Sequence, residues 1–556
     1  MKLSYNLIDE KWIPCLKPNA EPELLGLRDA LTNATQISEI LGESPPVTIA
    51  LHRLLLAILH RALDAPKDYA DWKRIWDAGN FETDKIFAYL EKYRSAFDLF
   101  DDEKPFFQTA AVGFERVKSV EKLFFQNTDT SWHFGDKRGA EVISLSPPEA
   151  ARCLTAMQAC DVGGLISAED GKESANSALL LQTAVALMRG ENLFETLMLN
   201  FHRYEGEYDA PFTFKNETDF PAWERTDLTQ PAERLPVGYA DLLTWQSRRL
   251  RLQPEISADG SAIVRNFVQM KGFQLFKNTE PKDYETMVAF RNKPDAKANE
   301  RAWFAVRFNV DKALWRDSLA LFQKVKPDDS NKQKGKVRQT VRPKIFDWLG
   351  DLAAEGFLKK TTTLQVDFLG VTADQANYKI WRHERLLLPL AYLGDDKISQ
   401  RLFIELGKAL SLAEDVAFIL KRGSQELATL LLAEHADHKA GRQPDKKNDV
   451  NPLAASFGIE DFYWSRLETP FKTLMLALPN DVREEIDEGE TQTFYGEKEL
   501  PHWRKTLREM AEAALLNTTR SLDASARNLK AAARAERLLY ALLRETLSEN
   551  KPEEKR

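Results

Sequence analysis

Hydrophobic residues recur at helical spacing along the last third of the chain. After about Arg385 the pattern predicts four long amphipathic helices, over roughly 398–436, 460–477, 502–516 and 522–547. A polar run over 438–451 separates the first two of them. Long helices joined by shorter connections are typical of a four-helix bundle. We therefore expect a separate helical domain of that kind in this part of the chain.

The first 385 residues combine helical and strand-like patterns. Helical spacing predicts a helix over 47–63, and Ser146 followed by two prolines and Glu149 predicts the start of another. Apolar runs predict a hairpin at 3–14 and strands at 249–252, 262–270 and 273–276. The sequence therefore predicts an α+β protein, with a large mixed α/β N-terminal domain over 1–385 and a C-terminal four-helix bundle over 386–556.

The charge balance argues against a DNA-binding protein that acts alone. The chain of 556 residues has 77 Lys and Arg against 85 Asp and Glu, a formal net charge of −8. A free-standing DNA-binding protein usually carries a net positive field. A local basic patch is enough when other subunits neutralise most of the phosphates, so DNA contact within an assembly stays open.

The sequence predicts neither export nor membrane insertion. Residues 1–14 lack a basic stretch followed by an apolar run, so we expect no signal peptide. No stretch of about 18 apolar residues predicts a membrane span. We expect a cytoplasmic protein with free thiols at Cys15, Cys153 and Cys160, whose spacing fits no zinc site.

Common catalytic motifs are absent from the sequence. It has no Walker-type phosphate loop, no GxSxG turn and no HExxH helix. The best metal-binding candidate is the pair His435 and His438 around Asp437. A solvated helix end, where the helix dipole favours histidine, is the other interpretation. We expect no enzyme, no metal and no cofactor; a metal-dependent enzyme of unrecognised helical fold is the alternative that this pair leaves open.

Several short strings follow one another along nearly the whole chain: NLID and WIP within 6–14, LSPPEAAR at 145–152, RGENLFETL at 189–197, PAW at 221–223, LTWQSRR at 243–249 and YWSRLE at 463–468. With these strings the chain resembles the large subunit (CasA family) of the type I-E Cascade CRISPR surveillance complex. The resemblance implies an α/β domain followed by a four-helix bundle.

The resemblance also implies a function. Such a subunit cuts nothing and recognises the motif flanking the target (the PAM) in double-stranded DNA through the minor groove. It then promotes unwinding for pairing with the guide RNA and helps recruit a helicase–nuclease. Its partners would be the other Cascade subunits, the guide RNA and the target DNA. A scaffold subunit that never reads DNA is the competing hypothesis.

The resemblance assigns DNA-reading roles to residues of the N-terminal domain. A glycine-rich loop at Gly163 and Gly164 would let the backbone approach the floor of the groove, because neither residue has a Cβ atom. A glutamine wedge at Gln375, with Asn377 as a neighbour, would enter the duplex beneath the PAM. The plainer interpretations are a helix C-cap for the glycines and an ordinary exposed side chain for the glutamine.

A third role in this resemblance belongs to a lysine at the turn of a hairpin. Lys271, in the string QMKGF, matches that lysine, and Lys277 is the alternative. The plainer interpretation is that the lysine is only solvated.

A long polar loop over 127–139 corresponds, by the resemblance, to one that contacts the guide-RNA end of the complex and neighbouring subunits. Its candidate contact residues are Asn127, Trp132, His133, Phe134, Lys137 and Arg138. Aromatic and basic side chains in one loop suit contact with RNA or protein. A loop that is disordered in the free protein and orders on assembly is the competing interpretation.

The last predicted helix carries a row of basic residues. Five of them fall within a stripe about 100° wide if the helix reaches back to the first: Arg520, Arg527, Lys530, Arg534 and Arg537. The apolar residues expected to pack into the bundle from the other side are Leu522, Leu529, Ala533, Tyr540 and Leu543. Such a row can follow a DNA backbone without reading its sequence. A solvated face with acidic partners such as Glu536 is the other interpretation.

Overall fold

The computed structural model divides the chain into two compact units, Met1–Gly394 and Asp395–Arg556. The structure describes residues 3–123, 143–204, 212, 217–297, 300–324, 339–374, 377–394, 397–436, 444–487 and 490–548, without the side chains of 433–436, 485–487 and 490–492. The boundary predicted at Arg385 lies inside strand β14 (Asn377–Pro389). Because β14 stays paired with β13 (Thr363–Asp374) as far as Pro389, the first unit continues beyond the predicted boundary.

The first unit combines helices with several small sheets. Its helices are α1 (Leu27–Thr32), α2 (Pro45–Ala62), α3 (Tyr69–Ala78), α4 (Thr83–Lys92), α5 (Pro147–Cys160), α6 (Leu193–Asn200), α7 (Tyr239–Leu243), α8 (Ser318–Phe322) and α10 (Lys344–Ala354). Its remaining strands are β1 (Ile13–Leu16), β2 (Pro22–Leu25), β3 (Glu39–Ile40), β4 (Lys118–Ser119), β5 (Gly164–Ala168), β6 (Gly171–Ala175), β7 (Val185–Arg189), β8 (Arg248–Ile256), β9 (Ala262–Lys271), β10 (Phe290–Asn292), β11 (Trp303–Ala305) and β12 (Thr340–Val341).

These strands pair in the orders β2-β1-β3, β11-β10-β12, β14-β13-β7 and β4-β9-β5-β6, and β8 also pairs with β9. The pairs are antiparallel except for β5 and β9, which meet in parallel where Ser167 lies opposite Met270. Helices and strands together confirm the predicted mixed fold class.

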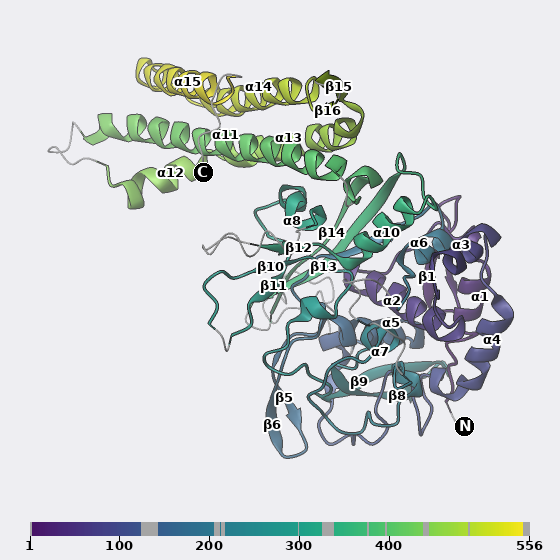
Figure 1. Ribbon diagram of the computed structural model, residues 1–556. Helices are drawn as coiled ribbons and strands as arrows, with labels where there is room; N and C mark the ends of the chain where they lie inside the picture. Colours follow the sequence, from purple (N-terminus) through teal and green to yellow (C-terminus); the bar gives the residue numbers. More distant parts are fainter. Residues whose placement is uncertain are drawn as a thin grey trace. The chain divides into compact units, whose positions relative to one another are not determined.

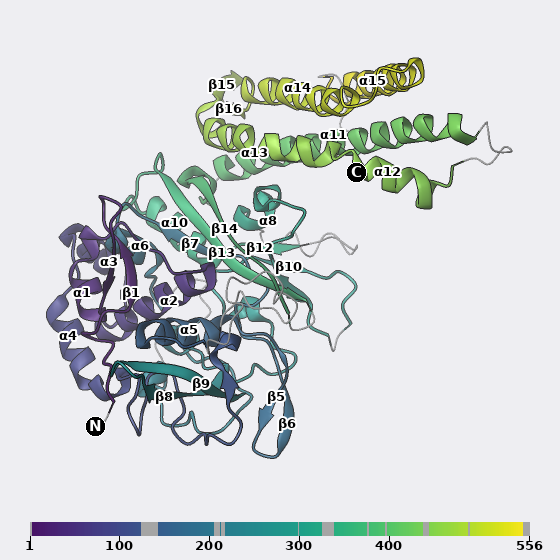
Figure 2. The same cartoon turned by 180° about the vertical axis from the view of Figure 1, so that it is seen from behind.

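Helix α2 lies at the centre of the first unit. Nearly all of its residues are buried, including the polar side chains of Thr48, His52, Arg53 and His60. Figures 1 and 2 show α2 and α5 between the β13–β14 pair and the β8–β9 pair. Helix α2 contacts β13, and α5 contacts β8 and β9. The fully enclosed Arg53 of α2 forms an ion pair with Glu285 at 3.0 Å, so its charge is compensated.

The clearest local signals of the sequence are confirmed in this unit. The predicted helix over 47–63 is α2, and the strands predicted at 249–252 and 262–270 lie within β8 and β9. At the start of α5, the Ser146 N–H donates to Glu149 Oε2 over 2.8 Å, which satisfies a backbone donor before the first turn.

Two local predictions are wrong. The N-terminal hairpin is formed by β1 and β2 rather than by residues 3–14, because Asn6 begins a turn that its own side chain closes onto the Ile8 N–H at 3.1 Å. Residues 273–276 form no strand, since the chain leaves the sheet at Gly272. That glycine packs so closely that a Cβ atom would lie 2.4 Å from the Gln246 carbonyl oxygen.

The second unit is organised along one long helix, α11 (Lys397–Ala436). Its other elements are α12 (Asn451–Ser456), α13 (Ile459–Ala477), β15 (Val482–Asp487), β16 (Glu490–Tyr495), α14 (Glu499–Thr519) and α15 (Ala526–Thr546). The four long helices overlap the four predicted ranges, and α11 packs against each of the other three. Among the described residues, no helix combines the length and apolar character needed to cross a membrane.

Helix α11 holds different partners along its length. Toward its N-terminal half, the indole of Trp503 on α14 donates to the Ala409 carbonyl at 2.9 Å, and the Tyr463 hydroxyl on α13 donates to the Ala413 carbonyl at 3.1 Å. Farther along, Leu427 and Leu431 form a buried cluster with Ala531 and Ala535 of α15. The small alanines allow α15 to approach α11 closely.

Two buried histidines make the stability of the first unit depend on pH. Burial lowers the pKa of both His52 and His202 from 6.5 to about 4. In the unfolded chain both gain a proton near pH 6.5, whereas the folded protein resists protonation until about pH 4. Their contribution is therefore complete above pH 6.5 and is lost as the pH falls toward 4. Between pH 7 and pH 5 we expect the free energy of unfolding, measured with urea, to fall by about 2 kcal/mol per histidine.

The His52→Gln variant tests the assignment. In the folded protein the Thr48 carbonyl lies 2.7 Å from His52 Nδ1. Glutamine keeps an N–H donor for this carbonyl, but its side chain does not titrate. We expect this variant to lose about half of the pH dependence, while His502→Gln, at an exposed position of α14, keeps all of it. An unchanged dependence in His52→Gln would show that other groups are responsible.

Candidate nucleic-acid interface

A buried carboxylate at the end of α5 connects three parts of the first unit. Asp161 Oδ2 accepts hydrogen bonds from Arg248 Nε at 2.5 Å and from Gln269 Nε2 at 2.6 Å, and the Tyr378 hydroxyl donates to Oδ1 at 3.4 Å. Arg248 belongs to β8, Gln269 to β9 and Tyr378 to β14. We call these four residues the Asp161 cluster. Burial, with the Asp161 charge next, raises the pKa of Tyr378 well above its ordinary value, so the phenol stays a neutral donor.

The Asp161 cluster fixes the backbone on either side of Gly163. Arg248 Nη2 donates to the Val162 carbonyl at 2.8 Å and to the Asn176 carbonyl at 2.9 Å. The Gly163 N–H donates to Ser177 Oγ at 3.2 Å. One guanidinium therefore joins the segment before the glycines to the segment after β6, and so holds both ends of the β5–β6 hairpin.

At both positions the local backbone geometry favours glycine over residues with a side chain. A Cβ atom on Gly163 would lie 2.8 Å from the Ser177 backbone nitrogen, so this position accepts no side chain without movement of the backbone. Gly164 has φ = 140°, a conformation that residues with a side chain rarely adopt. Gly164 is exposed and Gly163 partly so. The pair therefore presents backbone, without side chains, to the surroundings of the protein.

Lys271 lies beside this hairpin, although not where the sequence placed it. It is the last residue of β9, at the opposite end of the strand from the β8–β9 turn over 257–261, so the expected position at a hairpin turn is wrong. Its Nζ lies 3.9 Å from Glu173 Oε2 on β6. The structure thus brings Lys271 close to the strand that pairs with Gly164. The alternative, Lys277, is exposed and lies past the end of β9.

Asn377 is brought to the same region through its neighbour Tyr378. It is the first residue of β14 and lies opposite Asp374 of β13. Gln375, the expected wedge, lies outside the described residues, and so do all six candidate residues of the loop over 127–139. Asn377 and Lys271 therefore lie within two residues of the cluster members Tyr378 and Gln269, and the two glycines lie within three residues of Asp161.

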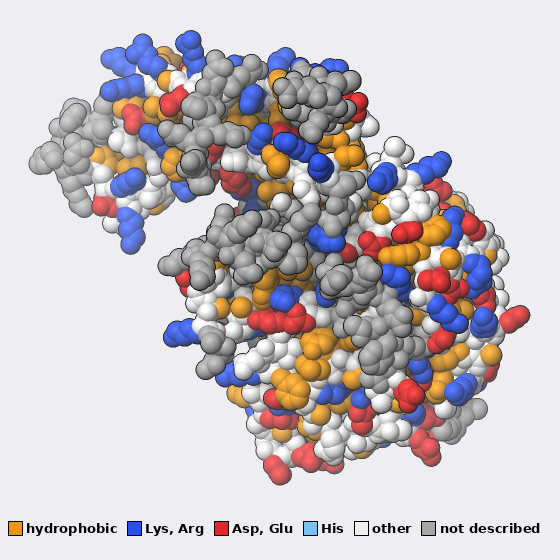
Figure 3. Space-filling view, viewed as in Figure 1, with side chains coloured by type: hydrophobic (Ala, Val, Ile, Leu, Met, Phe, Trp, Pro, Cys, Tyr) orange, Lys and Arg blue, Asp and Glu red, His pale blue; other side chains and the backbone are white. Residues whose placement is uncertain are grey.

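The basic stripe on α15 is shorter than predicted. Arg520 follows α14, and α15 begins only after Ser525, whose Oγ accepts from the Asn528 N–H at 3.3 Å. Arg527 turns inward, where its Nη2 donates to the Leu431 carbonyl. The exposed basic residues of α15 on one face are Lys530, Arg534, Arg537 and, beyond the prediction, Arg544. Figure 3 shows Lys and Arg side chains gathered over this helix.

The apolar side of α15 also differs from the prediction. Leu529 is 60% exposed and Tyr540 is 51% exposed. Ala533 is exposed as well. The predictions for Leu543, which is buried, and for Leu522, which packs against the cluster with α11, are confirmed. The buried face of the helix consists of Ala531, Ala535, Leu539 and Leu543. These residues are spaced four apart, and their alanines fit against α11 where larger side chains would not.

The described part of the chain offers no alternative centre for metal chemistry. No group of three or more His, Cys, Asp or Glu residues is placed there to hold a metal ion. The side chain of His435 and the whole of His438 lie outside the described residues. Cys15, Cys153 and Cys160 are free thiols, and burial raises the pKa of each to about 12, which suppresses the reactive thiolate.

The comparisons with known proteins agree with one another. The chain matches the sequence model of a family described as CRISPR-associated protein Cse1, over residues 6–514. It is 33% identical over 547 residues to a CRISPR-associated protein CasA/Cse1 of Thermus thermophilus, which covers 97% of each chain. The crystal structure of Thermobifida fusca Cse1 matches with a TM-score of 0.79 at 25% identity, over 98% of each chain. A chain of a CRISPR RNA-guided surveillance complex shares the fold, with a TM-score of 0.69 at 20% identity, over 97% of this chain and 99% of that one.

Proposed function

Because this chain belongs to the CRISPR-associated Cse1 family, we propose that it is the non-catalytic large subunit of a type I-E Cascade complex in the cytoplasm. Its partners are the other Cascade subunits, the guide RNA, double-stranded target DNA with a PAM, and a helicase–nuclease. The relative found in an RNA-guided surveillance complex supports the first two partners. The names of the relatives describe no enzymatic activity, which supports a role in binding.

The observation that carries the DNA-reading part of the proposal is the exposed backbone of Gly163 and Gly164, held by the Asp161 cluster. A minor groove is only about 6 Å wide, so a backbone without Cβ atoms can approach its floor where side chains cannot. The hydrogen bonds from Arg248 hold this backbone in place before DNA arrives, which lowers the entropy cost of binding. Lys271 adds a cation beside the same groove.

Duplex opening and recruitment are the further parts of the proposal. Gln375 would insert beneath the PAM, with Asn377 and the Tyr378 contact to Asp161 anchoring the strand that follows it. The loop over 127–139 would contact the guide RNA or a neighbouring subunit. Opening the duplex exposes a strand for pairing with the guide RNA, and the opened complex would then recruit the helicase–nuclease.

The proposed function is tested by adding the chain to a guide-loaded Cascade complex that lacks its large subunit. We expect the addition to restore binding of a target duplex with a PAM but not of the same duplex with the PAM replaced, as measured by electrophoretic mobility shift. Restoration of binding without dependence on the PAM would favour the scaffold alternative. No restoration at all would overturn the proposal.

The exposed face of α15 is proposed to follow the DNA backbone. Replacing Lys530, Arg534 and Arg537 together with glutamine should weaken target binding equally for all PAM sequences, because phosphates carry no sequence information. The slope of log K against log salt should become shallower by about 0.9 for each phosphate that is no longer neutralised, or about 2.7 in total. Filter-binding titrations of the assembled complex at several salt concentrations measure this slope.

A control variant with the same change in charge separates this role of α15 from a general effect. Lys11, Lys17 and Lys85 are exposed and form ion pairs with the carboxylates of Glu23 and Glu82. Replacing these three lysines with glutamine should leave the salt slope unchanged. Equal slopes in both triple variants would rule out α15 as a backbone-binding helix.

A further inference from the structure

A large cavity lies next to the glycines in the first unit. Its volume is about 820 Å³, within the range of about 300–1,000 Å³ that is usual for ligand sites. Asn176 and Ser177 form part of its wall. These are the residues that accept hydrogen bonds from Arg248 and from the Gly163 N–H. Residues 176 and 177 therefore both line the cavity and help to hold the Gly163–Gly164 backbone.

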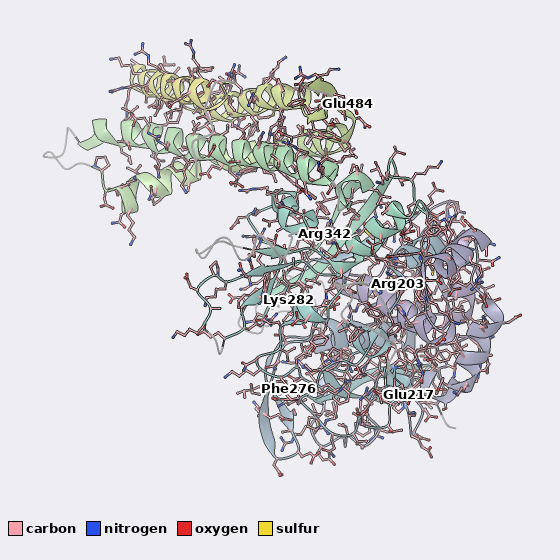
Figure 4. The ribbon with its side chains drawn as sticks, in the orientation of Figure 1. Arg203, Glu217, Phe276, Lys282, Arg342 and Glu484 are labelled. Atoms are coloured by element: carbon pink, nitrogen blue, oxygen red, sulfur yellow. The ribbon has the colours of Figure 1, made fainter. Side chains whose placement is uncertain are left out.

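Two phenyl rings are exposed at this cavity. Phe276 is 48% exposed and Phe304, on β11, is 47% exposed, although both line the cavity. Figure 3 shows hydrophobic side chains gathered on this face of the first unit, near the place where Figure 4 labels Phe276. Exposed rings at the edge of a cavity offer flat surfaces on which an aromatic ligand can stack.

The charged residues of the lining favour an anion. Its cations are Lys277, Arg301 and Arg307, and its acids are Glu233 and Glu285. Glu285 is already compensated by the buried Arg53, with 3.0 Å between Oε1 and Nη1. The lining therefore has three cations and a single acid, Glu233, whose charge is not compensated by a buried arginine.

The cations are positioned close to the rings. The Arg301 guanidinium carbon lies 5.6 Å from the centre of the Phe304 ring, and its Nε donates to the Trp303 carbonyl at 2.9 Å. Arg307 donates to the side-chain carbonyl of Gln182, another lining residue. Glu280 lies nearby, but its carboxylate accepts the backbone N–H groups of Ala302 at 2.6 Å and Trp303 at 3.1 Å. Positive charge and aromatic surface thus occur together on β11 and the segments on either side of it.

We propose that this cavity binds one unpaired nucleotide of a DNA single strand, with the base stacked on Phe304 or Phe276 and the phosphate held by Arg301, Arg307 or Lys277. Stacking on aromatic side chains and phosphate neutralisation by cations together characterise single-strand binding. The inference rests on the proposed function in one respect: opening a duplex at the adjacent glycines supplies the unpaired nucleotide. The cavity then holds that nucleotide away from its former partner.

The test uses the purified full chain and an oligodeoxythymidine of twelve nucleotides with one central 2-aminopurine, whose fluorescence falls when the base stacks. We expect saturable quenching with the unchanged chain and an approximately tenfold weaker dissociation constant for Phe304→Leu. Phe418→Leu, at an exposed phenyl ring of α11, is the matched control and should bind like the unchanged chain. Arg307→Gln should weaken binding as well and reduce its dependence on salt.

Several results would overturn the inference. Absence of quenching by the unchanged chain, or equal weakening by Phe304→Leu and Phe418→Leu, would remove the cavity as the site. Competition by free deoxyadenosine monophosphate at concentrations equal to those of the oligonucleotide would identify a site for mononucleotides instead of a strand. Melting temperatures of both leucine variants within about 2 °C of the unchanged chain show that the fold is kept. The oligonucleotide contains no PAM, so failure here is distinguishable from failure of PAM-dependent binding in the assembled complex.

Discussion

Replacing Gly163 with aspartate is expected to lower PAM-dependent target binding of the assembled complex by about 100-fold. The new Cβ atom would collide with the Ser177 backbone nitrogen at 2.8 Å, which displaces the backbone that approaches the groove. The added carboxylate would also face DNA phosphates, and such like-charge contacts cost several kcal/mol. Dissociation constants for duplexes with and without a PAM, measured by mobility shift, check this prediction.

The interpretation depends on a variant that still folds and assembles. Gly79→Asp is a suitable comparison, because Gly79 is a glycine in the left-handed region (φ = 65°), yet a Cβ atom there meets nothing within 4 Å. We expect it to bind target DNA like the unchanged protein. If Gly163→Asp assembles and binds a PAM duplex within twofold of the unchanged protein, the glycine backbone does not read the groove.

Replacing Arg248 with methionine is expected to lower the free energy of unfolding of the first unit by about 3–5 kcal/mol. The change leaves the Asp161 carboxylate buried without its cation and removes the donors to the Val162 and Asn176 carbonyls. Methionine keeps most of the apolar volume, so the loss reports mainly the charge and the hydrogen bonds. Urea unfolding followed by circular dichroism measures it.

An ion pair on the neighbouring strand provides the control for Arg248. Arg265 pairs with Glu255 at 2.6 Å, but both side chains are more than a third exposed. Exposed pairs contribute about 0–1 kcal/mol, so Arg265→Met should be nearly neutral. Equal losses for both variants would mean that removing an arginine from these strands is costly in itself. A small loss for Arg248→Met would show that water reaches Asp161 and compensates it.

The helices of the second unit could be predicted because a long helix repeats its apolar spacing many times. The predicted ranges overlap α11, α13, α14 and α15. The β15–β16 hairpin was not predicted, because VREEID and ETQTFY are mostly polar and each strand has only six residues. The buried face of α15 was predicted only in part for a related reason: Leu522 and Leu543 are correct, whereas Leu529 and Tyr540 are exposed. Alanines carry little hydrophobic signal, yet Ala531 and Ala535 are the residues that fit against α11.

The candidate site could be predicted only through the resemblance to a family, residue by residue. No local pattern reveals that Asp161 and Arg248, 87 positions apart in the sequence, meet in the core. A weaker signal was present, since Gln269 lies between the apolar residues Val268 and Met270 of β9. Buried polar side chains must find partners. Looking for partners of such residues would have identified the Asp161 cluster without showing its position beside the glycines.

The arrangement of partners along α11 limits how this protein can change in evolution. Each residue of a helix turns the following part by about 100°. Deleting one residue between Ala413 and Leu427 would keep the contacts of Tyr463 and Trp503 but rotate Leu427 and Leu431 away from α15. Insertions or deletions in this stretch are therefore tolerated only in steps that restore the helical phase, such as seven residues, whereas substitutions on its exposed side are not restricted in this way.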